Sequence, residues 1–437
     1  MSNRFSRRCF LRRSSGLALG AVMAPGLRLF AGSPNERLAL GYVGVANRAA
    51  ANLGATANLK DLVEVAALCD VDANYLGAAH KRHPRARTYH DFRRMLEREK
   101  LDAVVVSTPD HCHAVATAAA LRSGRHVYCE KPLARTVGEC RVVRQLAKQH
   151  GLKTQLGTQI HAGSNYRRVV ELVQTGAIGP VREVHVWVNA SYGGKDAPAA
   201  RPPVPPHLDW EQWLGPVPWH PYSPEYAPKT WRNWWDFGSG ALGDFGCHFM
   251  DLPHWALHLR APRTVEVVDG PPVHPDSTPP WLILRYEYPA RQRDGRPLPP
   301  VTLFWYHGGR KPDLLTAEQK KYFRSGVYFV GERGNLLADY GRRQLLPEER
   351  FADFTPPPPF IPDSVGHHRE WVEAIRHGGT TTCNFDYSGA LAEAVLLGNV
   401  AYRLNQRIEW DSDRLKVTNC PDAGRYLHPV YRPGWAL

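Results

Sequence analysis

Short apolar runs alternate with amphipathic stretches between residues 37 and 133. A short apolar run bounded by turn residues is typical of a buried strand, and apolar positions that recur every three to four residues are typical of a helix. Because the two kinds of segment alternate, we predict a parallel, doubly wound sheet. The pattern predicts strands at 38–45, 63–69, 103–107 and 126–129, and helices at 48–62, 91–98 and 113–122.

A different pattern follows residue 152. Val184, Val186 and Val188 share one face of a predicted strand at 181–190, as alternating positions do when a sheet buries one face. A chain of 437 residues exceeds one ordinary core, so we predict two domains, 32–155 and an α+β domain at 156–437. The other predicted elements of the second domain are strands at 153–157, 281–288, 301–307 and 326–331, and helices at 165–175, 367–377 and 388–404.

The segment 197–240 fits neither pattern. It contains ten prolines and six of the 13 tryptophans of the chain, which makes it too irregular for a helix or strand. Long loops in compact domains are often functional, and indole faces stack on the C–H faces of sugar rings. The segment therefore forms either a substrate wall or a packed core or interface. If it binds substrate, Arg232, Trp234 and Trp235 are the expected contacts.

The N-terminus has the pattern of an export signal. Arg7 and Arg8 precede Phe10 and Leu11, and a mildly apolar stretch follows from about residue 16 to residue 24. That stretch is too short to span a bilayer, so we predict no stable membrane anchor. This order of features predicts a Tat signal peptide at 1–31, with the Tat machinery as a partner and a periplasmic or extracytoplasmic location. The alternative is a basic arm that binds nucleic acid.

Charge and cysteine content narrow the class of protein. The net charge is +13, but six arginines and no acidic residues lie within 1–31, which leaves about +7 with no dense basic block. This moderate surplus indicates solvated surface, and we expect no nucleic-acid partner. Seven of the eight cysteines lie beyond the predicted signal, and none form a Cys-x-x-Cys pair, so we expect no disulfide framework.

The first predicted strand-to-helix turn is similar to a dinucleotide fingerprint. Gly44, Ala46 and Ala49 take the three glycine positions, and Ala46 departs from the usual glycine. The next strand ends at Asp70, where a carboxylate would bind the ribose hydroxyls of NAD and repel the 2′-phosphate of NADP. The combination predicts NAD as the cofactor, with NADP less favoured.

The strand at 103–107 is followed by a polar turn. Thr108, Pro109 and His113 lie where ligands bind in doubly wound sheets, at the carboxyl end of a strand. His111 and His113 stand two residues apart, but no further ligands are spaced to complete a metal site. We therefore expect no metal.

Two more clusters carry candidate chemistry. Asp244 and His248 are spaced four apart, which places them on one face of a helix. Glu130, Lys131 and Pro132 directly follow the strand at 126–129. A lysine, a carboxylate and an imidazole that converge beside a nucleotide fold are suited to alcohol oxidation by hydride transfer.

These motifs occur in the order seen in the Gfo/Idh/MocA oxidoreductase family, which the chain resembles over nearly all of its length after the predicted signal. The resemblance extends to Gly157-Thr158-Gln159 and to the segments 170–179 and 330–336. It implies a Rossmann domain followed by an open, mainly antiparallel sheet with helices on one face. It also implies that Lys131, Asp244 and His248 are the catalytic set. The residues implied along the cofactor are Gly44, Ala46, Asn47, Arg48, Asp70, Thr108, Pro109, His113, Glu130 and Gln159.

The expected reaction oxidises a secondary hydroxyl of a sugar, polyol or glycoside. His248 would be the general base, and Lys131 would hold the alcohol oxygen and stabilise the developing alkoxide. Asp244 would orient the imidazole or share the substrate hydroxyl, while Glu130 would position the nicotinamide end.

Export raises the question of how the cofactor is supplied, because little free NAD is present outside the cytoplasm. Transport of a folded protein would let a tightly bound NAD travel with it, and the redox cycle would then have to close. We expect either a plain sugar oxidoreductase or a redox-neutral enzyme that cleaves a glycoside and recycles its cofactor. A non-catalytic sugar-binding protein on the same fold is the remaining alternative. We also expect a homo-oligomer.

Overall fold

The structure is a computed structural model that describes residues 37–437. The predicted signal peptide at 1–31 lies outside the described residues. The first half of the described chain contains β1 (Leu38–Val43), α1 (Arg48–Ala57), β2 (Val63–Cys69), α2 (Ala73–Arg82), β3 (Arg87–Tyr89), α3 (Phe92–Arg98), β4 (Ala103–Val106), α4 (Asp110–Arg122), β5 (His126–Cys129), α5 (Val137–His150), β6 (Thr154–Leu156), α6 (Ser164–Gln174), β7 (Val181–Trp187) and α7 (Trp210–Leu214).

The second half contains α8 (Gly240–Phe249), α9 (Asp251–Leu257), β8 (Thr264–Asp269), β9 (Leu282–Tyr288), β10 (Arg291–Arg293), β11 (Arg296–Leu298), β12 (Val301–His307), α10 (Ala317–Tyr322), β13 (Gly326–Gly331), β14 (Gly334–Ala338), β15 (Arg343–Leu346), α11 (His367–His377), α12 (Phe385–Leu404), β16 (Ile408–Asp411), β17 (Lys416–Val417) and α13 (Gly424–Leu427). Four 3-10 turns complete these elements: η1 (Gln159–Ala162), η2 (Trp231–Asn233), η3 (Glu348–Phe351) and η4 (Pro421–Ala423).

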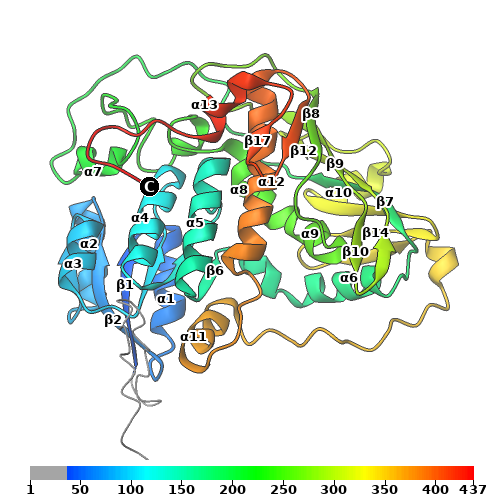
Figure 1. Cartoon of the computed structure of the whole chain (residues 1–437), viewed down its shortest axis with the longest axis horizontal. Coiled ribbons are helices and arrows are strands. Elements are labelled where there is room, and N and C mark those ends of the chain that lie inside the picture. The colour runs from blue at the N-terminus through cyan, green and yellow to red at the C-terminus, as the bar shows by residue number, and fades with distance from the viewer. Residues whose placement is uncertain (1–36) are drawn as a thin grey trace, which may run out of the picture. The chain divides into compact units, whose positions relative to one another are not determined.

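The first sheet has the order β3-β2-β1-β4-β5-β6, and all of its strand pairs are parallel. All four residues of β4 are buried, as a strand covered by helices on both faces requires. Figure 1 shows these strands in blue to cyan with their helices around them. The predicted doubly wound parallel sheet is confirmed, and the predicted strands at 63–69 and 126–129 have the bounds of β2 and β5.

The second sheet has nine strands in the order β15-β14-β13-β7-β12-β9-β8-β16-β17. Only the pair of β7 with β12 is parallel, and the other pairs are antiparallel. Burial alternates strictly along β9, so the strand has one buried and one partly exposed face. The predicted mainly antiparallel second sheet is therefore confirmed.

Helix α12 links the two sheets. It packs against α5 of the Rossmann part and against α8 and β8 of the second part, and Figure 1 shows it in orange beside α5. Sixteen of its residues are buried, so it lacks the polar face of a surface helix. The helix thereby fixes α8, which carries Asp244 and His248, relative to the Rossmann sheet.

Three local differences from the sequence prediction have physical reasons. Helix α4 begins at Asp110 rather than residue 113, because Pro109 precedes it and an acidic residue occupies its first turn. Helix α1 ends at Ala57 rather than residue 62. Helix α2 was not predicted, although Asp72 caps it by accepting hydrogen bonds from the backbone of Asn74 and Tyr75.

The chain between β7 and α8, residues 188–239, is called the strap below. It contains only the short helix α7 and the turn η2, yet it has a hydrophobic cluster of its own that includes Trp210, Trp213, Trp231 and Trp234. None of the helices within residues 37–437 combines the length and hydropathy of a membrane-spanning segment. All seven cysteines of this part of the chain are free thiols.

Candidate functional site

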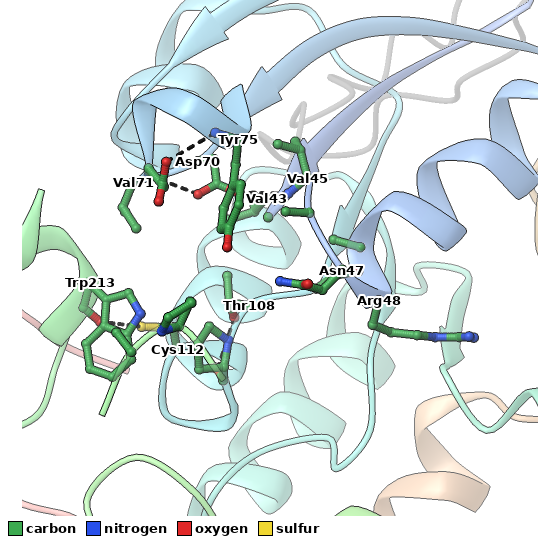
Figure 2. Close-up of a pocket in the computed structure, with 18 of the residues that line it drawn as sticks. Val43, Val45, Asn47, Arg48, Asp70, Val71, Tyr75, Thr108, Cys112 and Trp213 are labelled. Atoms are coloured by element: carbon green, nitrogen blue, oxygen red, sulfur yellow. Dashed lines mark hydrogen bonds between the residues drawn. The ribbon is translucent and has the colours of Figure 1, made fainter. Parts of the chain in front are cut away.

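A cavity of about 850 Å³ lies at the carboxyl edge of the first sheet. Its wall comes from the Rossmann turns, from the strap and from His248 on α8. Ligands of doubly wound sheets bind at this edge, and the volume is in the range of small-molecule and cofactor sites. Figure 2 shows its dinucleotide side, with Asn47 facing Trp213 of the strap across the space and Tyr75 pointing into it.

The turn between β1 and α1 has the form of a phosphate cradle. Gly44 has φ +88°, and a Cβ there would come within 2.6 Å of the Ser107 carbonyl oxygen, so only glycine fits. Asn47 has φ 53° and makes no side-chain cap, which leaves the first backbone N–H groups of α1 without a side-chain partner. A helix start of this kind is suited to a pyrophosphate, and Ala46 also lies on the cavity wall.

Asp70 closes the next turn along the sheet edge. Its carboxylate accepts hydrogen bonds from the backbone N–H of Val45 at 2.9 Å and of Asp72 at 3.0 Å. Burial raises the pKa of Asp70 to about 6, although these backbone donors oppose the shift. The two bonds fix the carboxylate on the cavity wall, where it fits the ribose hydroxyls of a dinucleotide.

The turn before α4 is held by a histidine. One ring nitrogen of His113, Nδ1, lies 2.7 Å from the Pro132 carbonyl oxygen, and the other, Nε2, lies 2.8 Å from that of Thr108. His113 is buried and therefore joins this turn to the one after β5. Thr108, Pro109 and His113 all line the cavity.

Glu130 is a buried anchor with three side-chain donors. It accepts from Arg48 at 3.1 Å, from Asn52 at 2.9 Å and from Gln159 at 2.7 Å. Burial favours the neutral form, but Arg48 and the neighbouring lysine outweigh it, so the pKa of Glu130 lies below its ordinary value. A Cβ at Gly157 would come within 2.6 Å of this carboxyl group. The arrangement supports a positioning role for Glu130 and leaves it no function as a neutral-pH acid.

Asp244 is the centre of the catalytic side. Its Oδ1 contacts Lys131 Nζ and lies 3.1 Å from Arg232 Nε, and its Oδ2 accepts from Tyr192 Oη at 2.8 Å. Burial opposes ionisation, but Lys131 and Arg232 hold the pKa of Asp244 well below its ordinary value. Lys131 also donates to the Asp244 backbone oxygen at 2.7 Å. The expectation that Asp244 orients His248 is not met, because its oxygens face two cations and a hydroxyl instead.

His248 follows Asp244 by one helical turn and lines the same cavity as Lys131. Burial, with Lys131 nearby, lowers the pKa of His248 to about 3. Its Nδ1 is enclosed and has no hydrogen-bond partner. Burial therefore favours the neutral imidazole, in which one ring nitrogen can accept a proton.

Of the three strap residues that were expected to contact the substrate, one lines the cavity and two do not. Arg232 lies on the cavity wall, with its guanidinium 4.0 Å from the ring centroid of Trp231. Trp234 and Trp235 do not line it: they are 2% and 6% exposed, and their indole N–H groups donate to backbone oxygens. Both are packing residues, because an irregular segment must bury apolar surface to become ordered.

Sequence reasoning missed Tyr192. It lies just after β7, and nothing in its local sequence marks it as functional. Only the fold brings its hydroxyl to Asp244.

Within residues 37–437, one buried group has the residue types of a metal site: His161, Asp251 and Cys383. The Asp251 oxygens already accept from His161 Nδ1 at 2.9 Å and from Tyr387 Oη at 2.7 Å. Burial raises the pKa of the Cys383 thiol well above its ordinary value, which disfavours the thiolate that binds metals. The group therefore has the features of a hydrogen-bonded core cluster.

Comparison with known proteins follows the same two-part division. Residues 38–158 match the model of the NAD-binding Rossmann fold of the Gfo/Idh/MocA oxidoreductases, and residues 164–295 match the C-terminal alpha/beta domain of the same family. Together the two models span more than half of the chain. The chain belongs to the Gfo/Idh/MocA family.

The curated relatives that the chain matches differ in their named activities. Inositol 2-dehydrogenase of Salmonella typhimurium is 29% identical over 150 residues, which are 34% of this chain and 45% of the relative. Alpha-N-acetylgalactosaminidase of Shewanella oneidensis is 27% identical over 175 residues, which are 38% of this chain and 36% of the relative. The matched part thus spans less than half of either relative.

Solved structures share the fold over most of the chain. The WlbA dehydrogenase of Bordetella pertussis, in complex with NADH and UDP-GlcNAcA, has a TM-score of 0.61 and 19% identity and covers 86% of this chain and 99% of its own. The aldose-aldose oxidoreductase of Caulobacter crescentus, complexed with glycerol, has a TM-score of 0.56 and 17% identity and covers 86% and 100%. At these identities the likeness concerns the fold.

Proposed function

We propose that the protein is an NAD-dependent oxidoreductase that acts on a secondary hydroxyl of a sugar, polyol or glycoside. One observation carries the proposal: Lys131, ion-paired with Asp244, shares a single cavity wall with His248 and the phosphate cradle at Gly44. Phosphate, ribose and proton-transfer groups therefore lie along one continuous site. This arrangement fits an alcohol placed between the cofactor and the second domain.

His248 is the proposed general base. A neutral imidazole has one ring nitrogen free to accept the hydroxyl proton as the carbonyl forms. When bound, the dinucleotide supplies the hydride acceptor. The C–H bond loses a hydride, the O–H bond loses a proton, and the alcohol becomes a ketone.

Lys131 is the proposed electrostatic group. Asp244 fixes the ammonium at the cavity wall, so it can donate to the alcohol oxygen as negative charge develops there. Arg232 lies at the same carboxylate oxygen and Tyr192 donates to the other, so both help to set the position of Asp244 and indirectly that of the lysine. Preorganised donors of this kind stabilise an alkoxide without moving during the reaction.

NAD is the proposed cofactor in preference to NADP. The half-buried Asp70 carboxylate is held by two backbone donors and would repel a 2′-phosphate. Arg48 pairs with Glu130 and His207 lies beside Asp72, so within residues 37–437 no ion pair joins a cationic side chain to Asp70. Relatives crystallised with NADH or NAD support the same assignment.

A redox-neutral glycoside-cleaving activity is the second candidate. The curated glycosidase relative favours it. Such a reaction oxidises a ring hydroxyl to a ketone, eliminates the aglycone, adds water across the double bond that this leaves and then reduces the ketone again. The hydride taken up in the first step returns in the last, and the proton removed from the carbon beside the ketone balances the one that the aglycone takes up.

Three further proposals concern the context of the enzyme. The twin-arginine sequence supports Tat export and a periplasmic location. A tightly bound, recycled NAD would suit that location, and a homo-oligomer is the proposed assembly. Cell fractionation and light scattering of the full-length protein test the location and the assembly.

The function is tested with His248→Ala and Lys131→Ala. We expect both variants to bind NAD and to lose turnover with every sugar or polyol that the wild type oxidises. Near-normal turnover in either variant contradicts the assignment. Release of free aglycone from an aryl glycoside without net NADH identifies the glycoside-cleaving route. Sugar binding without any redox change in the wild type indicates the non-catalytic alternative.

A further inference from the structure

The strap crosses from the second domain and is hydrogen-bonded to the Rossmann domain through its backbone. The Asp209 N–H donates to the Val71 oxygen at 2.9 Å, and the Ala73 N–H donates to the His207 oxygen at 2.8 Å. These two bonds pair Asp72 with Leu208 in an isolated antiparallel bridge. The bridge lies directly after Asp70, at the place where the ribose of a dinucleotide is bound in this fold.

A second connection lies deeper in the cavity wall. His111 on α4 is fully buried, with Nε2 2.8 Å from the Trp213 carbonyl oxygen and Nδ1 3.2 Å from that of Phe237. The rings of Trp210 and Trp213 are stacked with centroids 4.7 Å apart. The strap is therefore an ordered wall with its own core, even though it has little regular secondary structure.

The C-terminal tail covers the outer side of the strap. The Arg432 N–H donates to the Pro216 oxygen at 3.0 Å, and its side chain contacts the Gly215 oxygen and Glu211. The Arg93 guanidinium of α3 then lies 4.5 Å from the ring centroid of Trp435. Figure 1 shows the C-terminus in red beside α7. The C-terminal tail therefore contacts both the strap and the Rossmann domain.

We propose that residues 205–213 of the strap form the outer wall of the adenosine end of the dinucleotide site and gate the exchange of the cofactor. The inference rests on the proposed function in that it takes the ligand to be a dinucleotide. The Rossmann side of this part of the cavity includes Asp70 and Tyr75, and the strap side includes His207, Leu208 and Gln212. Separation of the strap from the turn at 71–73 would open this end of the cavity and let an adenosine seated between them leave faster.

The gate has a kinetic consequence. Opening adds one conformational step to both entry and exit, so weakening the connection speeds both rates and changes the Kd less than either rate. A simple binding contact would raise only the dissociation rate. A slow exit would also let one bound NAD serve many oxidation and reduction cycles.

The test uses Ala73→Pro in the full chain. Ala73 is exposed at the first position of α2, and proline is well tolerated there because that N–H has no partner within the helix. The substitution removes the N–H that donates to His207 and places the proline Cδ against the His207 carbonyl oxygen, so both effects weaken this connection. Ala317→Pro is the matched control, since Ala317 is exposed at the first position of α10, outside the cavity wall. Arg432→Ala is a second variant that leaves α2 unchanged.

NADH fluorescence gives association rates by mixing and dissociation rates by a chase with NAD. We expect the dissociation rate to be roughly five to ten times higher in Ala73→Pro, which corresponds to the free energy of one backbone hydrogen bond. The association rate should rise by a similar factor. Arg432→Ala should also speed both rates, while Ala317→Pro should match the wild type. Wild-type rates in both Ala73→Pro and Arg432→Ala would overturn the gate. A rise in the dissociation rate alone would show that the strap is a binding contact and not a gate. A wild type that binds no NADH would instead refute the proposed function.

Discussion

Replacing Lys131 with methionine removes one charge from the centre of the proposed site and keeps most of the side-chain volume. The Lys131 side chain is 12% exposed and that of Asp244 is 9% exposed, so their ion pair is largely shielded from water. Asp244 would keep Arg232 at 3.1 Å and Tyr192 at 2.8 Å, which limits the damage to the fold. Both bonds of the ammonium to Asp244, at Oδ1 and at the backbone oxygen, are lost, but the remaining partners of Asp244 offset part of the cost, so we expect a stability loss of about 1.5–3 kcal/mol.

The catalytic effect should be larger than the stability effect. Loss of one preorganised donor to a developing oxyanion costs about 10²–10³ in kcat. Nucleotide affinity should change little, because the phosphate and ribose contacts lie at Gly44 and Asp70.

The assay measures kcat under saturating NAD for the best sugar, the NAD Kd by calorimetry, and Tm. Lys153→Met is the matched control, since the Lys153 ammonium contacts the Gly379 oxygen and does not line the cavity. A kcat within tenfold of the wild type in Lys131→Met would refute the reasoning. So would an equal loss in Lys153→Met, because the effect would then be unrelated to the site.

Three more outcomes follow from the geometry. Asp70→Ser should weaken the binding of NAD about tenfold or more and favour NADP. In the wild type, the affinity for NAD should decrease as the pH drops below about 6, because the carboxylate that accepts the ribose hydroxyls becomes protonated there. An unchanged ratio of the Kd values for NAD and NADP in Asp70→Ser would contradict the ribose contact. Gly157→Ala should lower stability by about 1–3 kcal/mol and weaken NAD, because its Cβ would displace Glu130, and calorimetry measures both. Trp234→Ala should cost about 3–5 kcal/mol and leave the sugar KM of the folded protein unchanged; a raised KM with normal Tm would restore the substrate-wall hypothesis.

The Rossmann part was the more predictable half of the fold. β4 is buried on both faces, so its sequence is a short, continuous apolar run that cannot be confused with a surface segment. The turn at Gly44 was predictable too, because the positive φ and the nearby Ser107 oxygen exclude any side chain there. Such constraints are local, and local constraints leave a visible mark on the sequence.

The arrangement of the second half depends on contacts that the sequence does not mark. Spacing placed Asp244 and His248 on one helix face, yet the direction of the carboxylate is set by Lys131 and Arg232 from other elements. Composition showed that the strap is rich in tryptophan but not that Trp234 faces a core. The backbone bonds between the strap and the turn at 71–73 are independent of side-chain identity and leave no sequence signal.

The most direct test of the proposed hydride transfer measures the nicotinamide absorbance of the purified, full-length protein while sugars, polyols and glycosides are added one at a time. Mass spectrometry first establishes whether the protein retains NAD or requires added NAD. We expect at least one compound to convert the cofactor to its reduced form in a single turnover, and His248→Ala to abolish the change without loss of cofactor. Bound cofactor that no compound reduces, or an unchanged signal in His248→Ala, would contradict the proposed oxidoreductase function.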